Sequence, residues 1–379
     1  MKEKGLNSRP GPAGLTVEEQ LTALVYGDTF SMYDEKAYDA FIEPFRTRLK
    51  TNAIPLDIFK GKRCLDAGCG GGRGSILMAE NGASEVIAFD LSEKNIATTR
   101  RWARRKGLNS IKVRQGSLME LPFADEEFDI IWCNGVLHHS NEPDRGLQEI
   151  TRVLKTGGNL WLYLYGSGGI YWHVIDWIRG TVSGVTVAEA ILLLHLAQLP
   201  VGRIAERIDD WFVPHLRRYT AADVTNRLRE LGYDNTDTLK YGTDYDTSQR
   251  RVGAGETEKS IMGEGDLRFF CRKAGGPAGH RFSLPDPPDG KGSPYRDGKE
   301  VLKVDVPLAR LTAALDRIKA AGDYETRALL VLACSSVHQK ARSLLETKEK
   351  YDMPSLLRHL ADLADVLEKA AGYQKKADR

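Results

Sequence analysis

The sequence predicts an α/β protein with a doubly wound parallel sheet, and three features of residues 62–165 predict it. Short, largely apolar segments typical of buried strands recur at 63–68, 86–91, 111–116, 128–134 and 159–165. Helical patterns lie between them at 73–81, 93–106 and 144–155, the last closed by Lys155-Thr156-Gly157-Gly158. A glycine-rich turn follows the first strand. Such strand–helix repetition gives parallel βαβ units with right-handed crossovers.

The strand–helix pattern is interrupted at 166–214, where we expect a helical insertion over the mouth of the sheet. An aromatic, Gly-rich stretch opens this segment, and 185–199 and 203–214 then follow helical patterns. The α/β pattern resumes with an amphipathic helix at 219–233 and a strand at 266–273.

Proline and glycine mark the last boundary of the chain, where they predict a linker before three amphipathic helices at 304–321, 323–347 and 354–371. The N-terminal residues lack the apolar core of a signal peptide and are expected to form a flexible arm. The predicted divisions are this arm (1–20), a cofactor-binding core with N-terminal helices (21–165), a helical lid insertion (166–214), the completion of the sheet (215–274), the linker (275–299) and a C-terminal helical module (300–379).

Composition excludes several classes of protein. The 54 Lys and Arg against 52 Asp and Glu leave a net charge of +2, which rules out a strongly basic nucleic-acid coat. The five cysteines form no CxxC pair, so neither a disulfide framework nor a structural zinc site is expected, and a reducing cytosol is the natural compartment. The longest apolar stretch, 190–199, is too short to cross a bilayer.

The turn after the first strand is the most informative motif, and it reads Leu65-Asp66-Ala67-Gly68-Cys69-Gly70-Gly71-Gly72. Glycines at such a turn let the backbone approach a ligand and adopt positive φ. Open α/β sheets bind their ligands at this carboxyl edge. Asp90 ends the second strand, where its carboxylate can accept both hydroxyls of a ribose. The sequence therefore predicts a nucleoside site.

The same residues favour a cationic nucleoside over a dinucleotide. The dinucleotide fingerprint needs a third glycine, but Arg73 stands there when the motif is counted from Gly68, and Ser75 when it is counted from Gly70. Asp66 also brings a negative charge to the site. This charge would repel a pyrophosphate and attract a sulfonium or ammonium group.

Several segments resemble, in order and spacing, the motifs of class I S-adenosylmethionine-dependent methyltransferases. They are LDAGCGGG (65–72), Asp90, GSLMELPF (116–123), FDIIWCNGVLHH (128–139) and EITRVLKTGGNLWLYLY (149–165). The likeness is greatest to the branch that contains ubiquinone and menaquinone biosynthesis enzymes and many natural-product methyltransferases, and 217–233 resembles a later helix of that branch. The resemblance covers neither the insertion nor the C-terminal module.

This resemblance implies a Rossmann-like seven-stranded sheet with an antiparallel last hairpin, S-adenosylmethionine as cofactor and S-adenosylhomocysteine as product. The implied cofactor residues are Asp66, Gly68, Gly70 and Gly72 at the methionine end, Asp90 at the ribose, Leu91, Ser117 and Leu118 at the adenine, and Asn134 beneath the sulfonium. Many members carry aspartate where this chain has Ser117, and that aspartate accepts a hydrogen bond from the adenine amino group. We expect binding to survive with the weaker acceptor, because one neutral hydrogen bond contributes only about 0.5–1.5 kcal/mol.

His138 and His139 follow the fourth strand directly, and either is a candidate general base for a hydroxyl acceptor. The alternative is that the pair caps the strand-to-helix turn. The candidate substrate-binding residues are Tyr26, Tyr171, Trp172, His173, His215 and Tyr219. The aromatic residues of the insertion suit either a substrate wall or the core of the insertion itself. For Asp209 and Asp210 a solvated surface is favoured over contact with a substrate amine.

The sequence thus predicts a cytoplasmic methyltransferase that acts on an oxygen or nitrogen atom of a small or medium organic molecule, without a metal. One alternative is an RNA or protein substrate held by the cations at 100–106, although a solvated helix face or an acidic partner is favoured there. Another is a methyltransferase-like scaffold or cofactor sensor. The module at 300–379 is expected to serve oligomerisation or docking to a partner protein. Integral membrane association and nucleic-acid binding are not expected.

Overall fold

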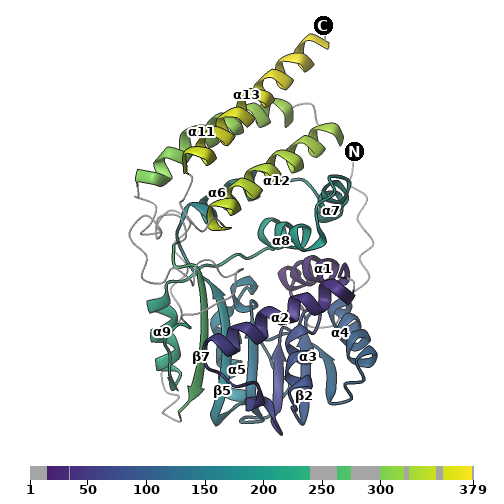
Figure 1. The fold of residues 1–379 in the computed structure, drawn as a ribbon, viewed down its shortest axis with the longest axis vertical. Helices are drawn as coiled ribbons and strands as arrows, with labels where there is room; N and C mark the ends of the chain where they lie inside the picture. Colours follow the sequence, from purple (N-terminus) through teal and green to yellow (C-terminus); the bar gives the residue numbers. More distant parts are fainter. Residues whose placement is uncertain are drawn as a thin grey trace.

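The computed structural model describes residues 15–33, 35–239, 263–274, 299–319, 324–346 and 353–377. Within these residues a seven-stranded sheet has the strand order β3-β2-β1-β4-β5-β7-β6 (Figure 1). The strands are β1 (Arg63–Ala67), β2 (Glu85–Asp90), β3 (Ile111–Gln115), β4 (Phe128–Asn134), β5 (Leu154–Tyr165), β6 (Tyr233–Asp234) and β7 (Asp266–Lys273). The first five are parallel, and β7 runs antiparallel to both β5 and β6. The predicted α/β class and its antiparallel last hairpin are confirmed.

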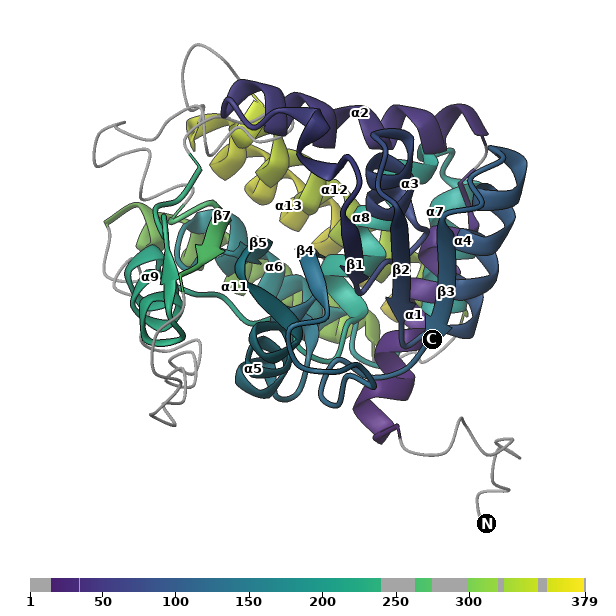
Figure 2. The ribbon, with the colours of Figure 1, turned by 90° about the horizontal axis from the view of Figure 1, so that it is seen from below.

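Helices cover both faces of the sheet because successive strand residues point to opposite sides (Figure 2). In β1, Cys64 joins the apolar core on one face and Leu65 joins the core on the other. In β4 the same alternation separates Trp132 from Cys133. The helices around the sheet are α2 (Glu35–Thr51), α3 (Arg73–Glu80) and α4 (Glu93–Arg105) on the Cys64 side, with the short helix η1 (Leu56–Phe59), and α5 (Pro143–Val153) and α9 (Ala221–Glu230) on the Leu65 side.

Two predicted boundaries are wrong. The segment Lys155–Gly158, expected to stop a helix, lies inside β5, because α5 ends at Val153 and Leu154 already pairs with Phe128 of β4. The helix α1 (Val17–Ser31) begins inside the segment expected to be a flexible arm. A capping box fixes its start: Glu19 accepts a hydrogen bond from the backbone of Thr16, and Thr16 accepts one from the backbone of Glu19.

Six helices form one helical domain above the carboxyl edge of the sheet (Figure 1). They are α6 (Ile170–Thr181), α7 (Val187–Leu196) and α8 (Val201–Phe212) from the insertion, and α11 (Lys299–Lys319), α12 (Tyr324–Glu346) and α13 (Met353–Ala377) from the C-terminal part. A single buried apolar cluster joins both sets, for example Ile175 of α6, Leu311 of α11 and Leu330 of α12. The insertion and the C-terminal helices therefore share one core.

The helix α1 lies between the two parts of the molecule. It packs against α4 of the sheet layer and against α8 of the helical domain, and its Val25 belongs to the helical-domain core. The predicted linker, up to residue 298, and the first 14 residues of the predicted arm lie outside the described residues. In the described part of the chain no helix is long and apolar enough to cross a membrane.

Candidate functional site

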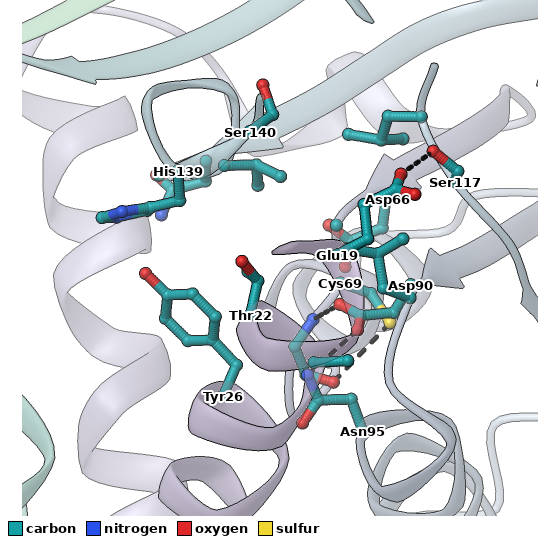
Figure 3. A pocket seen from close by; sticks show the side chains of 18 of the residues that line it. Glu19, Thr22, Tyr26, Asp66, Cys69, Asp90, Asn95, Ser117, His139 and Ser140 are labelled. Atoms are coloured by element: carbon teal, nitrogen blue, oxygen red, sulfur yellow. Dashed lines mark hydrogen bonds between the residues drawn. The ribbon is translucent and has the colours of Figure 1, made fainter. Parts of the chain in front are cut away.

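A pocket that is partly open to solvent lies where the carboxyl ends of β1, β2 and β4 meet α1. The carboxyl edge of an open α/β sheet is where such folds bind small molecules. One face of α1 forms a wall of the pocket, because lining residues recur at the helical spacing Glu19, Thr22, Tyr26 and Phe30. Figure 3 shows the first three pointing from α1 into the pocket.

The glycine turn after β1 forms the floor of the pocket at one end. Gly68 and Gly70 line it with positive φ angles of 80° and 53°. A Cβ on Gly70 would come within 2.7 Å of the Phe30 ring, so the turn and α1 meet here without room for a side chain. The expectation that Gly72 contacts the cofactor is not met. Gly72 does not line the pocket but begins α3 at a φ of 87°.

Asp66 is almost completely buried beside this turn and accepts a 2.6 Å hydrogen bond from the Ser75 hydroxyl. Burial raises the pKa of its carboxyl to about 7, while the Ser75 hydrogen bond lowers it. Arg73 lines the same end of the pocket, over the rings of Phe30 and Phe45. The pocket thus offers a carboxyl and a guanidinium side by side, a pair that suits the ammonium and carboxylate of an amino acid.

Asp90 ends β2 at the middle of the pocket and is held by three protein donors. The backbone of Gly70 donates to Oδ2 at 2.8 Å, and the backbone of Ser92 and the Asn95 amide donate to Oδ1 at 2.8 and 3.0 Å. Burial raises the pKa of this carboxyl, and these donors oppose the shift. Because each carboxylate oxygen has two acceptor positions, Asp90 keeps capacity for a hydroxyl on Oδ2.

The other expected cofactor residues line the same pocket. Leu91, Ser117 and Leu118 lie along one edge of it. Asn134 lines it at the end of β4, where its Oδ1 accepts a 3.0 Å hydrogen bond from the Trp161 indole. The structure adds Glu19, whose carboxylate accepts a hydrogen bond from the Ser117 hydroxyl (Figure 3).

His139 faces the pocket from the short helix η2 (Leu137–His139). Its Nδ1 lies 3.0 Å from the carbonyl oxygen of His215. Because a carbonyl can only accept, Nδ1 carries the ring proton, and Nε2 of the neutral ring is then an acceptor. Burial lowers the pKa of His139, which favours this neutral form, while the nearby Asp209 opposes the shift.

Oδ1 of Asp209, a residue of α8, lies 3.6 Å from Nε2 of His139. Tyr26 donates to one oxygen of this carboxylate at 2.6 Å and Tyr165 to the other at 3.1 Å. Burial raises the pKa of both phenols well above the usual value, so both stay protonated as donors. Asp209 is thereby held where it can stabilise a protonated His139, which corrects the expectation of a solvated carboxylate.

His138, the second candidate base, does not line the pocket. Its side chain is fully buried, neither ring nitrogen has a hydrogen-bond partner among the described residues, and its ring stacks on Tyr165 at 4.0 Å. Burial also lowers its pKa well below the usual value. Of the two adjacent histidines, the structure therefore places only His139 in the pocket.

The expected substrate residues divide into two groups. Tyr26 and His215 line the pocket, whereas the other four do not. The placement corrects the expectations for Tyr171, Trp172, His173 and Tyr219. Tyr171 and Trp172 are buried in the helical-domain core, and the imidazole of His173 lies 2.6 Å from Asp305 of α11. Tyr219 is buried in the core under the sheet, where its backbone bridges to Gly166.

Several polar residues that line the pocket were not expected from the sequence, among them Glu19, Thr22, Arg73 and Asn95. The capping motif Thr16-x-x-Glu19 marks the start of a helix, but nothing in the sequence places that helix over the sheet edge. Arg73 and Asn95 lie in the first turns of α3 and α4, shortly after the motifs at the ends of β1 and β2, and this position was the signal that the sequence offered.

Comparison with known proteins places this chain in a family. A family model described as a methyltransferase domain matches residues 65–162. The uncharacterized protein YafE of Escherichia coli is 32% identical over 140 residues, 35% of this chain and 67% of that protein. The 27-O-demethylrifamycin SV methyltransferase of Amycolatopsis mediterranei is 33% identical over 123 residues, 32% of this chain and 45% of that enzyme.

Among solved structures, the [4+2]-cyclase SpnF is 20% identical, and the match covers 71% of this chain and all of that chain with a TM-score of 0.44. The chain spans a smaller part of other curated relatives, such as 45% and 51% of two of them and 19% of a third. The motifs at 65–162, the sheet order and the extent of the YafE match agree. The chain belongs to the class I S-adenosylmethionine-dependent methyltransferases.

Proposed function

We propose that this chain transfers the methyl group of S-adenosylmethionine to an oxygen or nitrogen atom of a small or medium organic molecule. One observation carries the proposal: a single pocket is lined by Asp66, Asp90 and Arg73 and also by His139, whose Nδ1 bonds the His215 carbonyl and so leaves Nε2 of the neutral ring unprotonated. The first group suits the donor, and the second suits an acceptor that must lose a proton.

The charges in the pocket fit S-adenosylmethionine better than a dinucleotide. Two carboxyl groups, the buried Asp66 and the partly exposed Asp90, line the pocket beside the glycine turn. They complement the ammonium and sulfonium groups and the ribose hydroxyls, and Arg73 complements the single carboxylate. A pyrophosphate would place its negative charges beside the same two carboxyl groups. The residues present therefore support the cationic nucleoside.

When bound, S-adenosylmethionine supplies a methyl group activated by a positively charged sulfur. The chain's own residues then align the acceptor and take its proton. Nε2 of His139 accepts the proton of a hydroxyl or amine, and the carboxylate of Asp209 stabilises the imidazolium that forms. Tyr26 and Tyr165 hold that carboxylate in place. The helix α1 forms one wall of the pocket, which limits the access of water to the site.

A small organic acceptor is supported by a relative that is named for 27-O-demethylrifamycin SV as its substrate. None of the five cations at 100–106 lines the pocket, and Lys106 is paired with Asp39 at 2.7 Å. This disfavours a phosphate-rich acceptor. The five cysteines are buried free thiols, which supports the proposed cytoplasmic location. An oligomeric or partner role for the C-terminal helices remains part of the proposal.

Replacing Asp90 by alanine should weaken binding of S-adenosylmethionine and S-adenosylhomocysteine by about 10- to 100-fold. The hydrogen bond from a ribose hydroxyl to the charged Oδ2 is lost, and such a bond is worth about 1.5–3 kcal/mol. Calorimetric titration measures the effect. In parallel, NAD should not bind the unaltered chain.

Glu93→Ala is the matched control, because Glu93 is an exposed acid three residues further along. Its affinity should equal that of the unaltered chain. Undiminished affinity in Asp90→Ala would show that the ribose lies elsewhere, and binding of NAD alone would refute the proposed donor.

The raised pKa of Asp66 leads us to expect that cofactor binding depends on pH. A pKa of about 7 means that the carboxyl is mostly neutral at pH 5.5 and mostly ionised at pH 7.5. A cationic ligand binds better to the ionised form, so affinity should rise roughly 10-fold or more over this range, with a proton released on binding. Calorimetry at several pH values measures both quantities. Asp66→Asn should bind more weakly with a flatter profile, and a flat profile in the unaltered chain would contradict the assignment.

A further inference from the structure

We propose that Glu19 of α1 binds the 6-amino group of the cofactor's adenine and so supplies the carboxylate that the sheet of this chain lacks. The inference rests on the proposed function, because it assigns a role within the same cofactor site. It names a residue far from every sequence motif of that site, and it makes α1 part of nucleoside recognition.

The first argument is the position of Glu19 in the pocket. The adenine is expected beside Leu91, Ser117 and Leu118, all of which line the pocket. Position 117 has a hydroxyl where a carboxylate acceptor is common in the family. Glu19 lines the same pocket, and its carboxylate contacts that hydroxyl (Figure 3). A negative charge therefore stands at the adenine edge although the strand itself carries none.

The hydrogen bonds around Ser117 are the second argument. Its hydroxyl donates its only proton to Oε1 of Glu19, and its oxygen accepts the backbone N–H of Met119 at 3.1 Å. Ser117 is thus largely occupied within the protein. It orients Glu19 and leaves the carboxylate as the stronger acceptor for a ligand amino group.

The carboxylate of Glu19 still has room for a ligand. The helix cap uses Oε2, which accepts the backbone N–H of Thr16 at 2.8 Å, and Ser117 occupies one position on Oε1. A carboxylate has about four acceptor positions, so about two remain. The residue is only 7% exposed, which leaves little water to fill these positions once a nucleoside lies in the pocket.

The competing explanation is that Glu19 only caps α1. The two roles separate in a binding experiment with S-adenosylhomocysteine and its analogue that carries hydrogen in place of the 6-amino group. A capping residue affects both ligands equally, whereas a residue that accepts from the amino group affects only the first. The ratio of the two dissociation constants is therefore the informative quantity.

The full chain should bind S-adenosylhomocysteine about 10-fold or more tightly than the analogue, a factor that corresponds to about 1.4 kcal/mol. In Glu19→Met, which removes both the acceptor and the cap, the ratio should fall to about 1–2. In Thr16→Ala, which weakens the cap but keeps the carboxylate, the ratio should stay at its original value. Glu19→Gln, which preserves the capping box, should give an intermediate ratio.

The outcomes are distinct. No binding of S-adenosylhomocysteine to the unaltered chain would overturn the proposed function itself. Tight binding with a ratio below about 3 in the unaltered chain, or an unchanged ratio in Glu19→Met, would overturn the role of Glu19 and leave the proposed function standing.

Discussion

Replacing His139 by alanine is expected to lower kcat for methyl transfer by about 10²–10⁴-fold, the usual contribution of a general base. The reason is the fixed tautomer: the carbonyl of His215 holds the proton on Nδ1, so Nε2 is free to accept one from the substrate. Affinity for S-adenosylhomocysteine should change little, because the carboxyl groups and the glycine turn bind the cofactor. Initial rates with a labelled methyl donor and a hydroxylated acceptor measure the effect.

The pH profile gives a second test of His139. Because burial lowers the pKa of its imidazole, the ring should be neutral and active at pH 7 and above. The rate of the unaltered chain should fall as the pH drops through that lowered pKa, below the usual value of about 6.5. At saturating S-adenosylmethionine, where the titration of Asp66 no longer limits binding, the acid limb should disappear in His139→Ala, and added imidazole should restore part of the rate.

Two variants separate catalysis from packing at this site. His138→Gln alters the buried neighbour that does not line the pocket, so it should lower stability but keep kcat within a few-fold. Asp209→Asn keeps the shape of the side chain that Tyr26 and Tyr165 hold, but removes the charge that stabilises the imidazolium. It should lower kcat by less than His139→Ala does. Equal rates in His139→Ala and the unaltered chain would leave His139 a structural residue.

The parts of the site that the sequence predicted are those set by local chain geometry. Asp66, Gly68, Gly70 and Asp90 lie at the ends of β1 and β2, and a parallel sheet brings the ends of neighbouring strands to one edge whatever surrounds it. Short, bounded apolar segments also located the strands β1 to β4. These features depend on few residues, each close in sequence to the next.

The parts that the sequence did not predict depend on contacts between distant segments. The contact between Glu19 and Ser117 joins residues 98 positions apart, and that between Tyr26 and Asp209 joins residues 183 apart. An amphipathic pattern shows that a helix has a buried face but does not say against what that face packs. His138 and His139 were equivalent in sequence for this reason, and only the turn of η2 separates their environments.

The largest effect on stability is expected from the C-terminal helices. Removing residues 275–379 should abolish methyl transfer and expose the buried face of α6–α8, because α11, α12 and α13 complete the core of the helical domain. Burial of each aliphatic side chain stabilises the fold by roughly 1.5–3 kcal/mol. The remaining helices therefore lose more stabilisation than the total free energy of unfolding of a typical domain, about 5–15 kcal/mol. Thermal unfolding and activity measurements check this expectation.

Point variants in the full chain test the same idea without truncation. Leu330 and Leu332 both lie on α12, but Leu330 is 3% exposed within the core and Leu332 is 42% exposed. Leu330→Asp should lower the free energy of unfolding by about 3 kcal/mol or more, since it buries an unpaired charge in place of an apolar side chain. Leu332→Asp, the matched control, should change it little.

The helix α8 explains why these variants should also affect catalysis. Its Arg207 is buried and donates to acceptors that α12 supplies, the Ser335 hydroxyl at 2.9 Å and carbonyl at 3.3 Å and the Gln339 amide at 3.2 Å. Asp210 of the same helix accepts from Tyr171, which also contacts His338 of α12. α12 therefore fixes α8 by buried polar contacts as well as by apolar packing.

The position of Asp209 depends on this anchoring, because Asp209 is the neighbour of Asp210 on α8. Its carboxylate accepts a hydrogen bond from Tyr26 and lies 3.6 Å from Nε2 of His139. A shift of α8 would move the carboxylate that supports the proposed base. Leu330→Asp should therefore lower kcat more than it weakens binding of S-adenosylhomocysteine, whose main contacts lie on the sheet. If kcat stayed normal in a variant whose helical domain is measurably destabilised, α12 would serve stability alone, and the position of Asp209 would not depend on it.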